Sequence, residues 1–460
     1  RFSLRISGDV VRWVAALGCA ALLIGCGSEA PPPEGQVVVY VTTDAPLPAA
    51  PGDPPGDVPA LFDRLDLAVF EPGATEPCGG CKRRLAVDRD GVDSGAVSFG
   101  LVAAPGQGGF RVRARLYRSA TTIAGSPRPA STIELVAALP AVKQDAVTSV
   151  TLVLHTDDVG RPVGDLEQPV EPLPGRSPHG LVGSYPGAVR VPCPTAPPAN
   201  MACVPGGAFW MGDPTLDTTD SNEYDGRLER LVVLSPFFVD RTEVTVSKFR
   251  ASGLAISLIA GSPSDNPHVP DASFPYCRYT DEPGEFESHA VNCISWHLAA
   301  KYCESLGRTL ATEAQLEYLM SRLGRGPYAW GTDSPACEDA VFGREVGGSC
   351  EALGVGPVEV GSGFRDRLAL DGVQVVDLTG GVTEWAADAW NRESEGCWGT
   401  GVFVNPRCDT PSGLDAPARV MRGGGWYSSA SLLRAALRAR TANETQAVSA
   451  AIGLRCVSTP

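Results

Sequence analysis

Cysteines restrict the fold of this 460-residue chain more than any other feature of its sequence. Two of the fourteen, Cys19 and Cys26, lie in an apolar N-terminal region, and the remaining twelve form an even set. Pairing close neighbours leaves Cys303 and Cys456 as a sixth pair, although sequence alone does not fix the connectivity. Disulfides persist in oxidising compartments, so this set indicates an exported protein. The five neighbouring pairs are Cys78/Cys81, Cys193/Cys203, Cys277/Cys293, Cys337/Cys350 and Cys397/Cys408.

One of these pairs, Cys78-Gly-Gly-Cys81, also has the spacing of a thioredoxin-type redox motif. That motif belongs to a strand–helix–strand unit, and no such pattern surrounds it here. A structural disulfide is therefore the favoured interpretation, with a redox pair as the alternative.

The N-terminus indicates where the protein resides. Basic residues precede an apolar run from Val14 to Ile24, which is too short to span a bilayer but suits a secretory signal. The sequence Leu23-Ile24-Gly25-Cys26 resembles the lipobox of bacterial lipoproteins. We therefore expect residues 1–25 to be a lipoprotein signal peptide, Cys26 to be lipid-modified and residues 26–36 to be a tether. This predicts a protein of the bacterial cell envelope, anchored in the membrane through that lipid and exposed to periplasm or exterior. An ordinary signal peptide is the alternative.

Charge excludes one class of partner. The formal charge is −15 at pH 7, and no run of Lys or Arg occurs. Because a phosphate backbone is bound by a concentrated basic surface, nucleic acid is not an expected partner.

Residues 37–156 are expected to form a small antiparallel β-sandwich-like domain. Segments such as Val37–Thr43, Leu65–Phe70, Phe110–Tyr117 and Ser149–His155 alternate apolar and polar residues and are separated by turn residues. In Phe110–Tyr117 three arginines occupy the face opposite the apolar set. No catalytic constellation is visible here, so a recognition or spacer role is the default.

Residues 157–195 are rich in Pro and Gly and are expected to be a semi-rigid linker. Helices then appear among short strands in a second domain, residues 196–460. Thr312-Glu-Ala-Gln315 has the form of a capping box, and Ser295 is expected to cap a helix that carries Cys303. The apolar residues at helical spacing in both segments indicate core packing.

Four blocks in this second domain resemble, in their order and spacing, the sulfatase-modifying-factor family, whose best-known member is the formylglycine-generating enzyme. The resemblance covers roughly residues 200–458. It implies an α+β, C-type-lectin-like fold with little regular structure, and a disulfide between Cys303 and Cys456. The blocks are Cys203–Gly212; Phe237–Thr245; Ala290–Trp296 with Tyr302–Tyr318; and Asp377–Trp385 with Arg419–Arg440 and Gly453–Cys456.

The resemblance also implies a copper site, which this sequence does not match. The family enzyme oxidises a cysteine of a substrate peptide with copper held by two cysteines, and thiolates are the ligands that select Cu(I). Those two positions fall on Ser428 and Leu433, and the neighbouring family serine falls on Gly425. Copper is therefore not an expected cofactor. The five histidines are scattered, which also argues against an iron site.

Calcium is a second implied cofactor. The family loop that holds calcium through carbonyls and a glutamate appears here as Gly380-Gly-Val-Thr-Glu-Trp385, so Gly381, Val382 and Glu384 are candidate ligands. The family asparagine has become Gly381 and its first tryptophan Thr383. A loop held by its own hydrogen bonds is the alternative. The acidic run from Asp213 to Asp225 is expected to be an exposed, solvated loop.

Residues 419–440 remain as a candidate binding surface. Guanidinium groups and an indole ring suit a carboxylate, a peptide or a glycan, whereas the alternative is that they pack in the core. Two functions stay open: an exported, lipid-anchored binding or scaffolding module, or a formylglycine-generating oxidoreductase with diverged site residues. The candidate binding residues are Arg422, Trp426, Arg434 and Arg438.

Overall fold

The structure is a computed structural model that divides into two compact units, Arg1–Pro186 and Gly187–Pro460. The expected signal peptide, the lipidation site Cys26 and the tether lie outside the described residues, apart from residues 3–5 and 35–36. Across the described residues, no helix is long and apolar enough to cross a bilayer. The residues described are 3–5, 35–53, 56–144, 146–176, 179–216, 224–254, 267–392, 396–410, 418–440 and 449–460.

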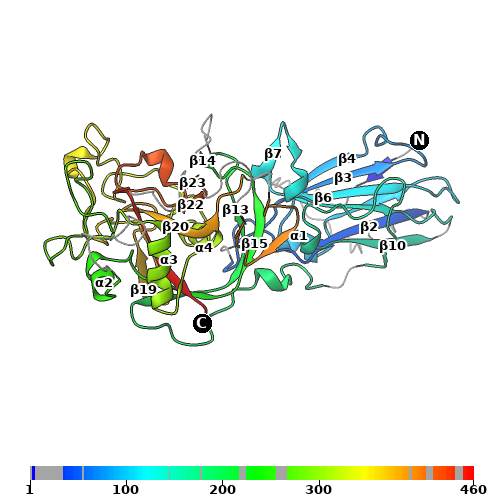
Figure 1. The fold of residues 1–460 in the computed structure, drawn as a ribbon. Coiled ribbons are helices and arrows are strands. Elements are labelled where there is room, and N and C mark those ends of the chain that lie inside the picture. The colour runs from blue at the N-terminus through cyan, green and yellow to red at the C-terminus, as the bar shows by residue number, and fades with distance from the viewer. Residues whose placement is uncertain are drawn as a thin grey trace, which may run out of the picture. The chain divides into compact units, whose positions relative to one another are not determined.

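Strands dominate the first unit (Figure 1). A mixed sheet has the strand order β1-β5-β2-β10-β11, and an antiparallel sheet has the order β4-β3-β6-β9. The elements are β1 (Ser3–Arg5), β2 (Gln36–Thr43), β3 (Arg64–Phe70), β4 (Lys82–Ala86), α1 (Arg89–Asp93), β5 (Ser98–Val102), β6 (Arg111–Tyr117), β7 (Thr122–Ile123), β8 (Ser126–Pro127), β9 (Ile133–Ala138), β10 (Val147–Leu154) and β11 (Leu173–Pro174), with 3₁₀ helices Ser119–Thr121, Pro129–Ser131 and Thr156–Asp158.

The two sheets pack face to face, as a β-sandwich requires. Along β6, Val112 and Leu116 are buried, whereas the intervening arginines are partly exposed, so the alternation read from the sequence is confirmed. A small apolar space lies between Leu154 of one sheet and Leu116 of the other. One feature differs from the expected antiparallel arrangement: β2 and β10 pair in parallel along their whole length.

The expected linker, residues 157–195, is divided between the two units. Its first part is hydrogen-bonded to the first unit: Val136 N donates to Val163 O, Ala138 N donates to Val170 O, and β11 pairs with β10. Its last residues belong to the second unit, where Val191 forms a bridge with Gly206. Proline is tolerated at sheet edges, so a Pro-rich composition does not distinguish an edge segment from a free linker.

The second unit combines short strands with three α-helices among its described residues. Its sheets have the orders β12-β16-β25-β17, β13-β15-β21, β14-β23-β22-β20-β24 and β18-β19. The elements are 3₁₀ Pro186–Ala188 at the unit boundary, β12 (Met201–Val204), β13 (Gly207–Met211), β14 (Tyr224–Asp225), β15 (Arg230–Leu234), β16 (Phe237–Asp240), α2 (Val246–Ala251), α3 (Trp296–Ser305), β17 (Thr309–Leu310), α4 (Glu313–Met320), 3₁₀ Glu351–Leu353, β18 (Arg367–Leu370), β19 (Val373–Val376), β20 (Thr383–Ala389), β21 (Val402–Val404), β22 (Arg419–Arg422), 3₁₀ Ala430–Leu433, β23 (Arg438–Arg440), β24 (Ile452–Gly453) and β25 (Cys456–Ser458).

Both helix starts read from the sequence are confirmed. The Ser295 side chain accepts from Leu298 N at the start of α3, and Thr312 and Gln315 form a reciprocal capping box at the start of α4. Leu316 and Leu319 of α4 are fully buried in the largest core cluster of this unit, which contains residues of β13, β20 and β22. This packing fixes the direction in which the first turn of α4 points its acidic side chains.

All twelve cysteines that the structure describes are in disulfides. Cys303 of α3 pairs with Cys456 of β25 across a sequence separation of 153 residues. The other five bridges join the sequence neighbours, Cys78–Cys81 included.

Candidate functional site

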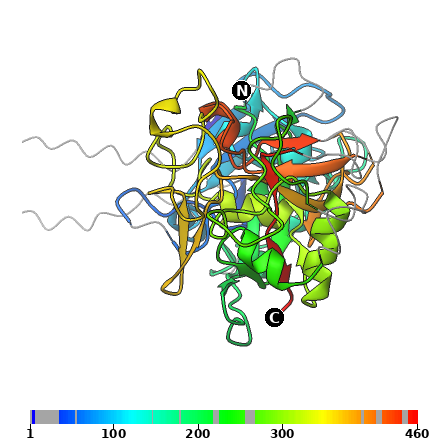
Figure 2. The same ribbon diagram turned by 60° about the vertical axis from the view of Figure 1, so that its left-hand side comes forward.

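The stretch 419–440 runs through the centre of one sheet. It forms β22, a turn, the 3₁₀ helix Ala430–Leu433 and β23 (Figures 1 and 2). The two strands pair antiparallel, with Arg422 opposite Arg438. The turn needs glycine: Gly424 has φ +68°, and a Cβ there would lie 2.9 Å from Leu433 Cδ2. The two strands therefore position Arg422 and Arg438, whereas Trp426 and Arg434 lie in the segment that connects the strands.

Arg422 and Arg438 form buried ion pairs. Their side chains are 1% and 2% exposed and converge on Glu313 at the start of α4, with Arg438 Nε–Oε2 at 2.8 Å and Arg422 Nη2–Oε2 at 3.2 Å. Arg422 Nη1 also lies 2.8 Å from Glu317 Oε2. Buried carboxylates from distant parts of the sequence pair with both guanidinium groups, which favours the alternative that these arginines pack in the core; ligand binding by them stays a prediction.

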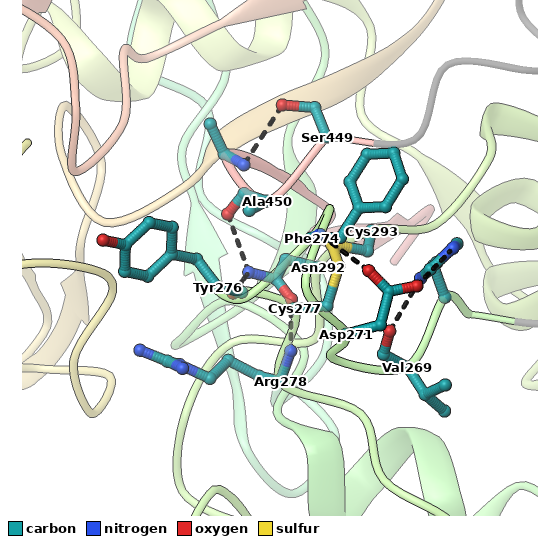
Figure 3. The surroundings of a disulfide bond; sticks show 12 residues. Val269, Asp271, Phe274, Tyr276, Cys277, Arg278, Asn292, Cys293, Ser449 and Ala450 are labelled. Atoms are coloured by element: carbon teal, nitrogen blue, oxygen red, sulfur yellow. Dashed lines mark hydrogen bonds and ion pairs between the residues drawn. A yellow bond between two sulfur atoms is a disulfide. The ribbon is translucent and has the colours of Figure 1, made fainter.

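Trp426 is also buried, which favours the alternative that it packs in the core; its role in ligand binding stays a prediction. The residue is 6% exposed, its ring centroid lies 4.9 Å from that of Tyr276, and its Nε1 donates to Ala450 O at 3.0 Å. The same carbonyl accepts from Asn292 Nδ2 at 2.7 Å, and Asn292 also donates to Tyr276 O (Figure 3). The Cys277–Cys293 disulfide joins the two segments that carry Tyr276 and Asn292 (Figure 3).

Arg434 is partly exposed, but it also has an acidic partner. Its Nη2 pairs closely with Asp213 Oδ2 and donates to Thr215 Oγ1. Burial acts to raise the pKa of Asp213. Hydrogen bonds from Thr215 and the nearby Arg434 guanidinium outweigh this effect, so the pKa of Asp213 lies below its usual value. Asp213, the first residue of the acidic run, therefore forms a structural ion pair with Arg434, whereas an exposed, solvated loop was expected. Asp217, Asp220 and Glu223 lie outside the described residues.

The two positions implied as copper ligands lie in different surroundings. Ser428 is 4% exposed, and its Oγ accepts a hydrogen bond from Gly425 N at 3.0 Å. Leu433 is fully buried in an apolar cluster with Tyr328 and Phe342. Neither of these two side chains can ionise to give a thiolate-like metal ligand.

Next to Ser428 the structure contains a cavity of about 140 Å³. The polar residues that line it are Thr383, Arg422, Tyr427, Ser428 and Arg440. This cavity was not predicted from the sequence. Two departures from the family pattern could have indicated it. Thr383 is smaller than the tryptophan that the resemblance implies at its position, and Ser428 is less reactive than the implied cysteine.

Comparison with known proteins identifies the second unit. The family model described as "Sulfatase-modifying factor enzyme 1-like domain" matches residues 189–460, more than half of the chain. The chain belongs to this family. The family match begins at residue 189, close to the boundary between the two compact units.

Relatives of this sulfatase-modifying-factor domain include named enzymes. The formylglycine-generating enzyme of Thermomonospora curvata is 27% identical over 298 residues, which cover 57% of this chain and 94% of that protein. The formylglycine-generating enzyme of Bos taurus is 25% identical over 305 residues, covering 57% and 75% respectively. Among solved structures, PvdO from Pseudomonas aeruginosa aligns at 20% identity with a TM-score of 0.38, covering 59% of this chain and 98% of that one.

The donor set does not fit the copper that the family implies. Cu(I) is selected by thiolates, whereas Ser428 offers a hydroxyl and Leu433 only methyl groups. No cysteine in the described part of the chain is free to supply a replacement, since each is in a disulfide. No reaction step through copper can therefore be assigned to these residues.

The implied calcium loop is held by protein groups. Glu384 is 1% exposed with Oε1 2.8 Å from Arg455 Nε, and Gly381 O accepts from Trp426 N. Val382 N donates to Glu243 Oε1 at 2.8 Å. Within the described residues, no group of three or more His, Cys, Asp or Glu side chains is arranged to hold a metal. This geometry favours the alternative of a loop held by its own hydrogen bonds; calcium binding stays a prediction.

Several buried carboxyl groups predict an unusual dependence of stability on pH. Burial raises the pKa of Glu317, Asp366 and Asp388 to about 7, and a second buried carboxyl adds to this in each case. The folded protein therefore binds more protons than the unfolded chain between about pH 4 and pH 7. We expect the free energy of unfolding to fall by a few kcal/mol from pH 5 to pH 8, measured by urea denaturation.

The matched variant for this prediction is Asp366→Asn. It removes one titrating group that accepts hydrogen bonds from the backbone and hydroxyl of Thr379. Its stability should depend on pH less steeply than that of the wild type. A wild-type stability that rises between pH 5 and pH 8 would contradict the assignment.

Proposed function

We propose that this chain is an exported, lipid-anchored protein whose sulfatase-modifying-factor domain is a non-catalytic binding module. One observation carries the proposal: the two positions that hold copper in the family enzyme are a hydrogen-bonded serine, Ser428, and a buried leucine, Leu433. The expected ligands are a peptide, a protein or a glycan. Similarity to formylglycine-generating enzymes supports the competing function, a diverged oxidoreductase that modifies a protein cysteine.

Copper(I) affinity separates the two functions. A thiolate pair binds Cu(I) tightly, whereas a serine hydroxyl and a leucine side chain do not. In a competition titration against a chromogenic Cu(I) chelator, the full-length protein should leave the chelator loaded. The Thermomonospora curvata enzyme is the positive control. Withdrawal of one equivalent of Cu(I) by the wild-type protein would favour the oxidoreductase.

The proposed anchoring rests on Cys26 and on the disulfides. Twelve cysteines in six bridges suit an oxidising compartment. In a bacterial host supplied with a labelled fatty acid, the wild-type protein should incorporate the label and Cys26→Ser should not. Equal labelling of both proteins, or of neither, would show that Cys26 is not the lipidation site.

A further inference from the structure

The two large sheets of the first unit have four edges, and three of them have features that prevent pairing with another chain. The edge strand β4 has basic residues at positions 82–84, and the edge strand β11 contains Pro174. The outer side of β9 is bridged by Val163 and Val170. Charged residues, proline and a covering segment are the means by which native proteins avoid edge-to-edge association.

The fourth edge consists of β5 and the three-residue strand β1 outside it. The sequence of β5, Ser98-Phe-Gly-Leu-Val102, contains no charged residue and no proline. One side of β5 pairs with β2 along the whole strand. On the other side, the only strand among the described residues is β1, which pairs antiparallel with Ser3 opposite Val102. The backbone on this side of β5 therefore accepts a strand.

β1 belongs to the segment that the proposed export removes. It lies within residues 1–25, the expected signal peptide, so the lipid-anchored protein begins at Cys26 and lacks this strand. β5 itself stays in place, because it remains paired with β2 and its side chains Phe99 and Leu101 are buried. In the described part of the mature chain, the outer N–H and C=O groups of β5 are then left without a strand partner. Such an edge is a template for another chain.

We propose that the mature protein forms a dimer in which β5 pairs antiparallel with β5 of a second copy, about a two-fold axis at Gly100. The inference rests on the proposed function, because the edge opens only when residues 1–25 are removed. A two-fold contact is closed, so it covers both open edges at once. With the axis at Gly100, Phe99 lies opposite the partner's Leu101, and both stay on the buried face because opposed residues share a face of the sheet.

A second copy is favoured over an unrelated chain for two reasons. No like charges meet when the uncharged β5 pairs with itself. Lipid anchoring holds the copies on one membrane, which raises their effective concentration. A strand pair of five residues is smaller than a standard protein interface, so the dimer should be weak and reversible. Covalent trapping is therefore the appropriate test.

A cysteine at the axis should trap the dimer. Directly opposed residues of antiparallel strands have Cα atoms about 4.5–5.5 Å apart, which is within the span of a disulfide. The twelve described cysteines are already paired, so they do not compete with the thiol of Gly100→Cys. In protein isolated from bacterial membranes with free thiols blocked, Gly100→Cys should form at least about tenfold more disulfide-linked dimer than Thr75→Cys. Thr75 is exposed and lies between β3 and β4, strands of the other sheet.

Charge at the axis should prevent the dimer. Gly100→Lys places two ammonium groups opposite each other, and like charges across an interface are strongly unfavourable. In vesicles that contain donor-labelled and acceptor-labelled copies, Gly100→Lys should reduce energy transfer to less than about a tenth of the wild-type value. Thr75→Lys makes the same change in charge and should leave the transfer unchanged. Equal transfer in the folded Gly100→Lys protein and the wild type would overturn the proposal.

Intact mass and lipid labelling separate this inference from the proposed function. A cleaved, labelled protein in which Gly100→Cys gives no more dimer than Thr75→Cys contradicts only the inference. A protein that retains residues 1–25 and carries no label contradicts the proposed anchoring as well. A disulfide-linked product with the mass of this chain and a different protein would overturn the choice of a second copy as the partner.

Discussion

Replacing Glu313 by glutamine should cost roughly 3–5 kcal/mol of unfolding free energy, most of the stability of an ordinary domain. The Glu313 carboxylate is fully buried and pairs with both Arg422 and Arg438, which are also buried. The substitution removes the shared negative charge and leaves two guanidinium groups without it in the interior. Urea denaturation followed by circular dichroism would measure the loss.

The matched control is Glu304→Gln, since Glu304 lies exposed on α3. It makes the same chemical change and should alter the free energy of unfolding by less than about 0.5 kcal/mol. If Glu313→Gln also cost less than about 1 kcal/mol, the buried network would not hold β22 and β23 to α4 as described.

Removing the disulfide between Cys303 and Cys456 should have an effect of similar size. The bridge joins residues 153 apart, and in the chain-entropy model a loop of this length contributes about 4–5 kcal/mol. A Cys303→Ala, Cys456→Ala double variant should therefore unfold at a much lower urea concentration than the wild type.

The protein contains its own control for this loop-length argument. The bridge between Cys78 and Cys81 spans a sequence separation of only three residues, so it restricts the unfolded chain much less. The corresponding Cys78→Ala, Cys81→Ala variant should lose clearly less stability. Equal losses in the two double variants would mean that loop closure is not what determines the effect.

Local signals in the sequence were sufficient to predict the helix starts and several strands. Thr312 and Ser295 cap their helices through contacts three residues away, and the alternation in β6 lies within one strand. The parallel pairing of β2 with β10 was not predicted, because strand direction depends on chain connections that periodicity does not describe.

The roles of the arginines depend on contacts that are distant in sequence. Arg422 meets Glu313 at a separation of 109 residues, and Arg438 meets it at 125. The spacing of arginines within one stretch does not show whether such distant partners exist. A binding surface and a buried ion-pair network therefore could not be distinguished from the sequence. The cavity was missed for the same reason, because Thr383 and Ser428 come from separate strands and turns.

The central claim is that this sulfatase-modifying-factor domain does not oxidise peptide cysteines. Its direct test is incubation of the full-length protein with copper, oxygen and a Cys-x-Pro-x-Arg peptide, with the aldehyde product followed by mass spectrometry. The Thermomonospora curvata enzyme is assayed in parallel. We expect the peptide cysteine to stay unmodified over a time in which that enzyme completes many turnovers. Formation of the aldehyde by the wild-type protein at a rate above the protein-free control would contradict it.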